Sequence, residues 1–247
     1  MKRSPKSVQA RLSALPAGLL AGLLGGLLPA APAQADPGYY LLTPYSTPGV
    51  AALDLRYWTV KMPKQPAVLW PEAGLRYGVD SRWTTELFLS YIGESWGEQA
   101  LSSWNWQNSY LLTQGQLPFD LALHAQLIRN VNVGNALEVG PVFQTDWGFT
   151  QINANLVFEH DWASNKGTQL KYQWQLMRRL QPGLRVGLQG FGELGPWKDW
   201  SDRQSHRAGP MMRLGLGETV ELQAAYLWGK VYGRKAEMFS AQLLIPF

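Results

Sequence analysis

The chain has 247 residues, is rich in tryptophan and tyrosine, and contains no cysteine. It carries 22 basic and 18 acidic residues, but the first 35 residues hold four of the bases and no acid, so the remainder has no net charge. A nucleic-acid-binding protein is excluded, because no basic stripe with interleaved aromatic residues is present. The lack of cysteine excludes a disulfide framework.

The amino-terminal residues have the features of a cleaved signal peptide. Basic residues precede an apolar run over residues 12–28, and small residues follow at 33–35. The run contains four glycines and is shorter than the roughly 20 apolar residues of a membrane-spanning helix. We therefore predict that residues 1–35 are removed, that residues 36–49 form an irregular periplasmic segment, and that residues 50–247 form the folded domain.

Beyond this segment, apolar and polar side chains alternate with a period of two, which is typical of strands with one apolar and one polar face. The alternation is clearest where Leu121 and Leu123 face one side while Asp120 and His124 face the other. Twelve strands are predicted, over residues 50–60, 70–78, 82–92, 101–112, 119–127, 136–145, 150–159, 169–176, 184–194, 206–214, 220–226 and 236–247.

The last predicted strand places Phe239, Leu243 and Phe247 on one face and ends on an aromatic residue. A final strand that ends in phenylalanine resembles the assembly signal of outer-membrane β-barrels. Pro246 departs from that pattern, but proline is tolerated at the end of a strand, where no ladder hydrogen bond need be donated. The barrel assembly machinery is therefore an expected partner.

The connections between the predicted strands alternate in length. Those after odd-numbered strands are long, as in 93–100 and 160–167, whereas most of those after even-numbered strands are short, as in 78–81 and 146–149. Short periplasmic turns and longer outer loops are typical of an even-stranded barrel with both termini in the periplasm. The alternative is a soluble β-sandwich, because alternation alone does not show which face meets water.

The signal peptide, the loop lengths and the load of 12 tryptophans and 10 tyrosines together favour the barrel. The predicted fold is all-β: a single antiparallel up-and-down transmembrane β-barrel of 12 strands over residues 50–247, in the outer membrane of a Gram-negative bacterium. Outer-membrane lipid would contact its apolar faces. No apolar run after residue 35 is long enough for a spanning helix.

The polar faces would then line the lumen. The candidate lumen-lining residues are Arg56, Arg76, Glu86, Asp120, His124, Glu138, Asn155, Lys171, Arg185 and Glu193, with Arg207 and Arg213 provisionally turned inward. Such charges need partners in a narrow lumen. They could form a paired network that packs the interior, or a constriction that selects solutes. A twelve-stranded barrel is intermediate in width between filled barrels and open porins.

An outer-membrane lipid-modifying enzyme is the least favoured function. Such enzymes place His and Ser two residues apart on the barrel rim, whereas His160 and Ser164 are four residues apart in a predicted loop. We predict no catalytic residue. We also predict no cofactor and no metal site, because the chain has three histidines and no cysteine.

Two stretches carry a resemblance to a known group. Leu188–Pro210 contains LQGFGELGPWKDW and QSHRAGP, with a Gly209-Pro210 pair in a late strand, and Glu138–Gly148 reads EVGPVFQTDWG. These stretches resemble small proteobacterial outer-membrane barrels similar to the transporter-like group named after the meta pathway of phenol degradation. The resemblance implies a channel or transporter for small solutes or small apolar compounds. A structural or surface-interaction barrel with a plugged lumen is the alternative.

Overall fold

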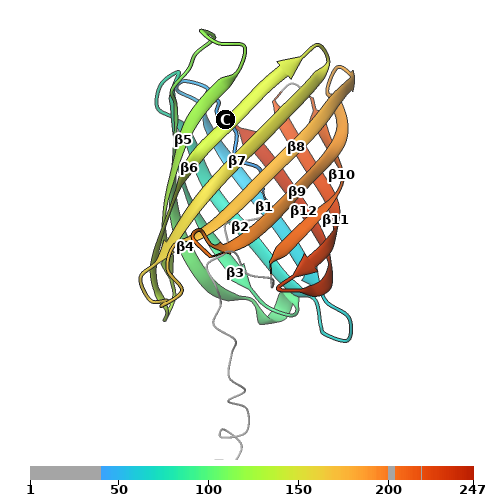
Figure 1. Cartoon of the computed structure of the whole chain (residues 1–247). Helices are drawn as coiled ribbons and strands as arrows, with labels where there is room; N and C mark the ends of the chain where they lie inside the picture. The colour runs from blue at the N-terminus through green and yellow to red at the C-terminus, as the bar shows by residue number, and fades with distance from the viewer. Residues whose placement is uncertain (1–39, 200–203, 218) are drawn as a thin grey trace, which may run out of the picture. The chain divides into compact units, whose positions relative to one another are not determined.

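The computed structural model describes residues 40–199, 204–217 and 219–247, in which twelve strands form one sheet (Figure 1). The strands are β1 (Ala51–Lys61), β2 (Val68–Gly78), β3 (Trp83–Ile92), β4 (Ala100–Leu111), β5 (Asp120–Asn130), β6 (Gly134–Trp147), β7 (Thr150–Asp161), β8 (Gln169–Gln181), β9 (Leu184–Pro196), β10 (Ser205–Leu216), β11 (Val220–Val231) and β12 (Arg234–Pro246). A short 3₁₀ helix, η1 (Trp96–Glu98), lies between β3 and β4. Among the described residues, no helix is long and apolar enough to cross a membrane.

The sheet closes on itself. Each strand pairs antiparallel with its neighbours in sequence, and β1 pairs with β12 in a register that places Leu53 opposite Ile245. The Phe247 amide donates to the Ala51 carbonyl at 2.9 Å and extends this seam beyond β12. Closure leaves no strand edge without a partner, which a sheet in hydrocarbon requires. The predicted twelve-stranded antiparallel barrel is confirmed.

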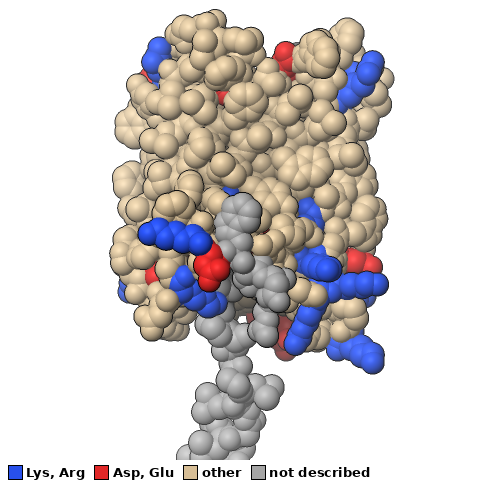
Figure 2. All heavy atoms as spheres, in the orientation of Figure 1, with Lys and Arg blue, Asp and Glu red and all other residues tan. Residues whose placement is uncertain are grey.

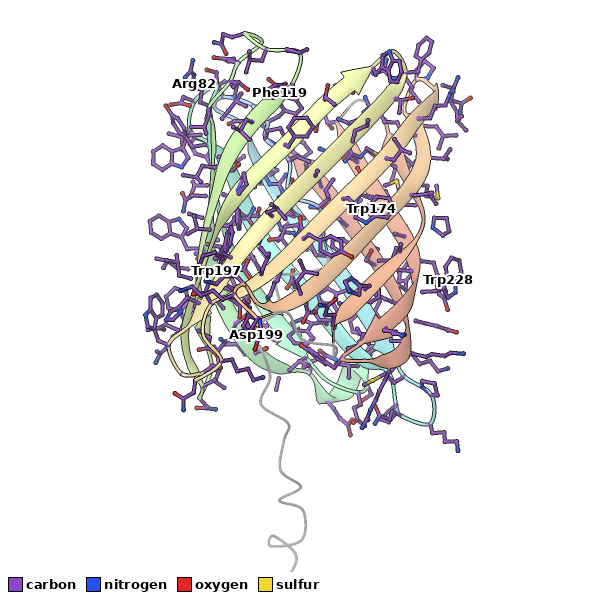
Figure 3. The ribbon with its side chains drawn as sticks, in the orientation of Figure 1. Arg82, Phe119, Trp174, Trp197, Asp199 and Trp228 are labelled. Atoms are coloured by element: carbon purple, nitrogen blue, oxygen red, sulfur yellow. The ribbon has the colours of Figure 1, made fainter. Side chains whose placement is uncertain are left out.

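The wall of the barrel has an apolar outer face. Leu75 is 61% exposed, Leu123 46% and Trp228 51%, and Figure 3 shows Trp228 projecting from the outside of the wall. An apolar belt of this extent is stable only against lipid. In a β-sandwich Leu123 would be buried in a dry core, so the sandwich alternative is wrong and the protein is an outer-membrane barrel.

The two ends of the barrel differ. At the terminus end, β1 begins and β12 ends; at the opposite end, the loop end, lie connections such as 62–67 and 162–168. The predicted alternation in loop length is only partly present. On the loop end, Tyr232 and Gly233 form a two-residue turn with φ values of 48° and 80°, as in a type I′ hairpin, while the terminus end has the long connection 112–119.

One terminus-end turn shows how a side chain fixes a connection. The carboxylate of Asp80 accepts hydrogen bonds from the backbone amides of Arg82 and Trp83, at 2.7 and 2.8 Å. These two bonds lower the pKa of Asp80. The turn between β2 and β3 is therefore stabilised by the ionised carboxylate.

The predicted signal peptide, residues 1–35, lies outside the described residues. Of the predicted irregular segment, residues 40–49 are described, and they contain no strand. Its assignment to the periplasm stays a prediction.

Candidate functional site

The structure places all ten predicted lumen residues on the inward rows of their strands. Arg56, Glu86, His124, Glu138, Asn155 and Lys171 are buried, while Arg76, Asp120, Arg185 and Glu193 are partly exposed. Hydrogen bonds that skip a strand show that these rows face the lumen. For example, Arg185 Nη1 on β9 donates to Gln151 Oε1 on β7 at 2.6 Å. Most of the charged members fall into ion-paired groups.

The largest group, the arginine cluster, consists of Asp54, Arg56, Glu72, Arg76 and Glu86. Arg56 Nη2 lies 2.9 Å from Asp54 Oδ2 and 2.5 Å from Glu86 Oε1. Arg76 bridges the same two carboxylates, at 2.6 Å to Asp54 and 3.3 Å to Glu86. The register creates this arrangement, because it pairs Arg56 with Glu72 and Arg76 with Glu86 on adjacent strands.

Neutral donors complete the arginine cluster, in which three carboxylates face two guanidinium groups. Gln242 Nε2 donates to both oxygens of Asp54, at 3.0 and 2.8 Å. Ser90 Oγ donates to Glu72 Oε1 at 2.8 Å. Buried charges depend on their ion-pair and hydrogen-bond partners, so this cluster acts as one unit that joins β1, β2, β3 and β12.

A second group, the lysine cluster, lies on β5 to β8. Lys171 Nζ forms ion pairs with Glu159 and, at 3.4 Å, with Glu138 Oε1. His124 Nε2 lies 4.0 Å from Glu138 Oε2. The lysine cluster therefore joins three of the ten candidates to Glu159, which the alternation also places on the inward row of its strand.

The remaining charged pairs lie on β9 to β11. Arg207 Nη2 lies 3.0 Å from Glu193 Oε1, and Arg213 Nε lies 3.2 Å from Glu221 Oε1. The structure turns both arginines inward: Arg207 is buried and pairs across the inward face of β9 and β10, and Arg213 donates to the buried Gln223 of β11.

The chain itself occupies part of the lumen. We call the residues Tyr40 to Tyr45 the lumen segment. Tyr45 lies at the terminus end, and the segment continues from there into the lumen to the buried Tyr40. The Tyr40 hydroxyl donates to Gln107 Oε1 on β4. The Leu42 amide donates to Gln173 Oε1 on β8 at 3.2 Å, and the Leu42 carbonyl accepts from Asn155 Nδ2 at 3.0 Å. The lumen segment is thus bonded to opposite parts of the wall.

Apolar and cation–π contacts add to these hydrogen bonds. The guanidinium carbon of Arg56 lies 3.5 Å from the centre of the Tyr40 ring, and Phe88 meets the same ring edge-on at 6.3 Å. Tyr40 and Leu42 also pack in one apolar cluster with inward residues of β4 to β7, namely Leu111, Ala122, Val142 and Val157. The arginine cluster and the lumen segment therefore stabilise each other.

The inward rows also carry an apolar surface that the sequence analysis did not predict. It forms one contiguous cluster, the apolar cluster, which consists of Trp58, Val60, Trp70, Met177, Phe191, Met211, Ala225, Leu227, Val231, Ala236 and Met238. Most members lie toward the loop end, on β1, β2 and β9 to β12. Within it, Trp58 and Trp70 stack with ring centres 4.2 Å apart.

The apolar cluster corrects the expectation that polar side chains line the whole lumen. Leu227 and Met238 are fully buried although they face inward. In a barrel of this width, inward side chains can pack against one another and exclude water. Alternation therefore identified the inward positions but not the chemical character of every position.

Two hollows flank the occupied part of the lumen. One, of about 440 Å³, lies at the loop end beside the apolar cluster and is lined by Met62, Val231, Tyr232 and Arg234. The other, of about 190 Å³, lies at the terminus end and is lined by residues that include Tyr45, Arg76 and Gln242. The lumen segment and the arginine cluster lie between the polar hollow and the apolar cluster.

The candidate residues for catalysis do not meet. His160 Nδ1 lies 3.3 Å from Thr168 Oγ1, while Ser164 Oγ accepts from the Lys166 amide at 3.2 Å. Neither contact joins His160 to Ser164. Within the described part of the chain, no group of histidine and acidic side chains is arranged to hold a metal ion.

Comparison with known proteins finds similar structures but no similar sequence. No family model and no curated protein matches the chain. The NanC porin superposes with a TM-score of 0.60 at 6% identity, covering 78% of this chain and 98% of the porin. An outer-membrane channel from Pseudomonas putida F1 superposes with a TM-score of 0.57 at 12% identity, covering 86% and 99%. The chain therefore shares its fold with outer-membrane channels.

Proposed function

We propose that the protein is an outer-membrane channel for small apolar compounds, with its loop end facing the outside of the cell. The observation that carries this proposal is the apolar cluster inside the lumen, beside a hollow that opens at the loop end. A site for a small apolar compound is a concave surface lined mainly by apolar and aromatic side chains. The resemblance of Leu188–Pro210 to the phenol-degradation group of transporter-like barrels supports the same class of solute.

A pore for ions is less well supported by the same wall. The arginine and lysine clusters contain both signs of charge, and their members form ion pairs at short range. Selective ion channels instead present rings of one sign of charge or of carbonyl oxygens. The charged clusters therefore serve to hold the barrel and the lumen segment together.

Passage through the barrel would require the lumen segment to move. Hydrogen bonds to five residues of the wall hold the lumen segment in place. Tyr40, Leu42 and Tyr45 donate to Gln107, Gln173 and Asp120, and the carbonyls of Leu42 and Tyr45 accept from Asn155 and Thr84. Each bond has a net contribution of about 1 kcal/mol. Burial of Tyr40 and Leu42 adds to this hold. A barrier of this kind permits a closed resting state and occasional opening.

Binding of the radiolabelled apolar probe naphthalene tests the solute class. The protein is reconstituted in nanodiscs, and bound probe is measured above that of empty nanodiscs. Met238→Gln places a polar group in the apolar cluster and should lower binding. The matched control is Ser240→Gln, the next inward residue of β12, where the neighbour is Gln189. Equal binding by Met238→Gln and the unaltered protein would refute the proposed solute class.

Conductance in planar bilayers tests whether the lumen segment closes the channel. Deleting residues 36–46 should raise single-channel conductance, because the lumen segment then no longer fills the space beside the arginine cluster. The lumen segment also favours the alternative function, a structural barrel with a plugged lumen, because the segment occupies the lumen. If the deletion leaves conductance unchanged and the unaltered protein binds no naphthalene, the structural alternative replaces the channel.

A further inference from the structure

A cluster of basic side chains lies on the outer wall at the loop end. Lys61 on β1, Lys230 on β11 and Lys235 on β12 all fall on outward rows of neighbouring strands. The register places Lys230 directly opposite Lys235, and Lys61 opposite Glu237. Figure 2 shows basic side chains gathered at the lower right of the molecule, at the end of β11 and the β1–β2 connection.

The positive charge of this cluster is not balanced by the described residues. None of Lys61, Lys230 and Lys235 forms an ion pair within the described ranges. The nearby carboxylate, Glu237, accepts a hydrogen bond from the Tyr226 hydroxyl at 2.7 Å. Like charges directly opposite each other on paired strands are destabilising, so an anion bound between Lys230 and Lys235 would relieve their repulsion.

A groove adjoins these lysines. Its volume is about 460 Å³, and its lining includes Lys61, Met62, Trp228 and Lys235 together with one carboxylate, Glu237. Lys230 lies beside the lining, opposite Lys235. The β1–β2 connection forms one side of the groove, and the outer wall of β11 and β12 forms the other. Apolar side chains therefore lie beside cationic ones, which is the combination that an amphiphilic ligand with an anionic head requires.

The groove lies at the border of the lipid belt. Trp228 is half exposed and packs against Tyr226 with ring centres 5.1 Å apart, and aromatic residues of this kind occur at headgroup level. Phe239 and Leu243 continue the same outward row of β12 toward the terminus end. The lysines thus stand at the depth where lipid phosphates lie, with apolar wall on the membrane side.

Other basic side chains at this end are separate from the cluster, because Lys166 and Lys198 lie in the β7–β8 and β9–β10 connections. The β3–β4 connection, by contrast, carries Glu94 and Glu98 and no basic residue. Basic clusters at the end of membrane-spanning segments attract anionic lipid headgroups. Single lysines spread around the loop end would point to general surface attraction, whereas three lysines on adjacent strands beside one groove point to a defined site.

We propose that this groove binds lipid A, the phosphorylated glycolipid of the outer leaflet, with a phosphate between Lys61, Lys230 and Lys235 and an acyl chain along Met62 and Trp228. The placement in the outer leaflet rests on the orientation given under the proposed function. The binding itself does not depend on what passes through the lumen.

Native mass spectrometry of the refolded full chain tests the site, with lipid A carrying both phosphates as the probe. The triple variant K61Q/K230Q/K235Q should bind lipid A about tenfold more weakly or worse. The matched control K166Q/K198Q removes lysines from other loop-end connections and should bind normally. Dephosphorylated lipid A should bind the unaltered protein as weakly as intact lipid A binds the triple variant.

Equal binding of lipid A by the triple variant and the unaltered protein would overturn the proposal, as would equal binding of dephosphorylated lipid A. Tighter binding of phosphatidylglycerol than of lipid A would also overturn it, since that result would assign a glycerophospholipid to the site.

A second variant guards against misfolding: K235Q in lipid-free detergent should keep or raise the midpoint of thermal unfolding, because it removes the opposed charge. Naphthalene binding should not change in either variant, which separates failure of this site from failure of the proposed channel.

Discussion

The arginine cluster and the apolar cluster occupy the same inward rows, yet they are built from opposite chemistry. Along β1, the inward positions change from Asp54 and Arg56 to Trp58 and Val60 within one step of the alternation. On β2, Trp70 gives way to Glu72 in the same way. On these two strands the inward row is therefore divided along its length, with charge toward the terminus end and apolar packing toward the loop end.

We therefore expect the arginine cluster and the apolar cluster to respond differently to substitution of their residues. The arginine cluster depends on every partner, because removing one ion leaves the others buried without compensation. The apolar cluster depends on volume and shape, so its losses scale with the atoms removed. Three substitutions distinguish these responses, and each is measured as the free energy of unfolding in urea of the protein folded into phospholipid vesicles.

The largest loss is expected for Arg56→Met. Asp54 and Glu86 then each lose one of their two cations, and for Glu86 it is the closer one. Breaking a buried ion pair on one side costs about 4 kcal/mol. The matched control is Arg213→Met, whose pair with Glu221 is partly exposed and should contribute less than about 1 kcal/mol. Similar losses for the two variants would contradict the view of the arginine cluster as a mutually dependent unit.

A smaller loss is expected for Leu227→Ala in the apolar cluster. Leu227 is fully buried, and truncating such a side chain costs about 3 kcal/mol, of which part is the cavity left behind. Leu222→Ala, on the outward row of the same strand, serves as the control and should cost less, because lipid fills the space. If both truncations cost the same, Leu227 does not lie in a dry interior.

The smallest effect is expected for Trp58→Phe. The replacement keeps an apolar ring but weakens the stack with Trp70, at a cost of about 1 kcal/mol. The near-ultraviolet circular dichroism of the tryptophan pair should also fall. Trp147→Phe, at a side chain that is 84% exposed, should change neither quantity. An unchanged dichroism spectrum in Trp58→Phe would show that the two indoles are not stacked.

Much of the fold could be predicted from the sequence, because alternation reports directly on a wall with two faces. Leu121 and Leu123 against Asp120 and His124 identify one strand, and repetition of that pattern gives all twelve. The strand ends were less predictable. β11 and β12 run to a two-residue turn at Tyr232, since polar side chains such as Lys230 can extend a strand beyond the membrane.

The lumen was predictable in part. Inward parity selected residues such as Arg56 and Glu86, but their contact across β2 depends on strand stagger, which a single strand's sequence does not contain. The lumen segment has no periodic pattern, and its bond from Tyr40 to Gln107 joins residues 67 positions apart. The apolar cluster did leave a signal, because Trp58 and Val60 share the parity of Arg56.

The seam between β1 and β12 has a consequence for the order of biogenesis. Tyr40 and Leu42 lie inside a ring that is complete only when β12, made last, has paired with β1. The segment that enters the periplasm early must therefore either wait in position while eleven strands assemble around it, or thread afterwards through a finished opening. In the first case the lumen segment serves as a template for the strands that contact it. Its removal would then slow assembly of the barrel in addition to altering permeability.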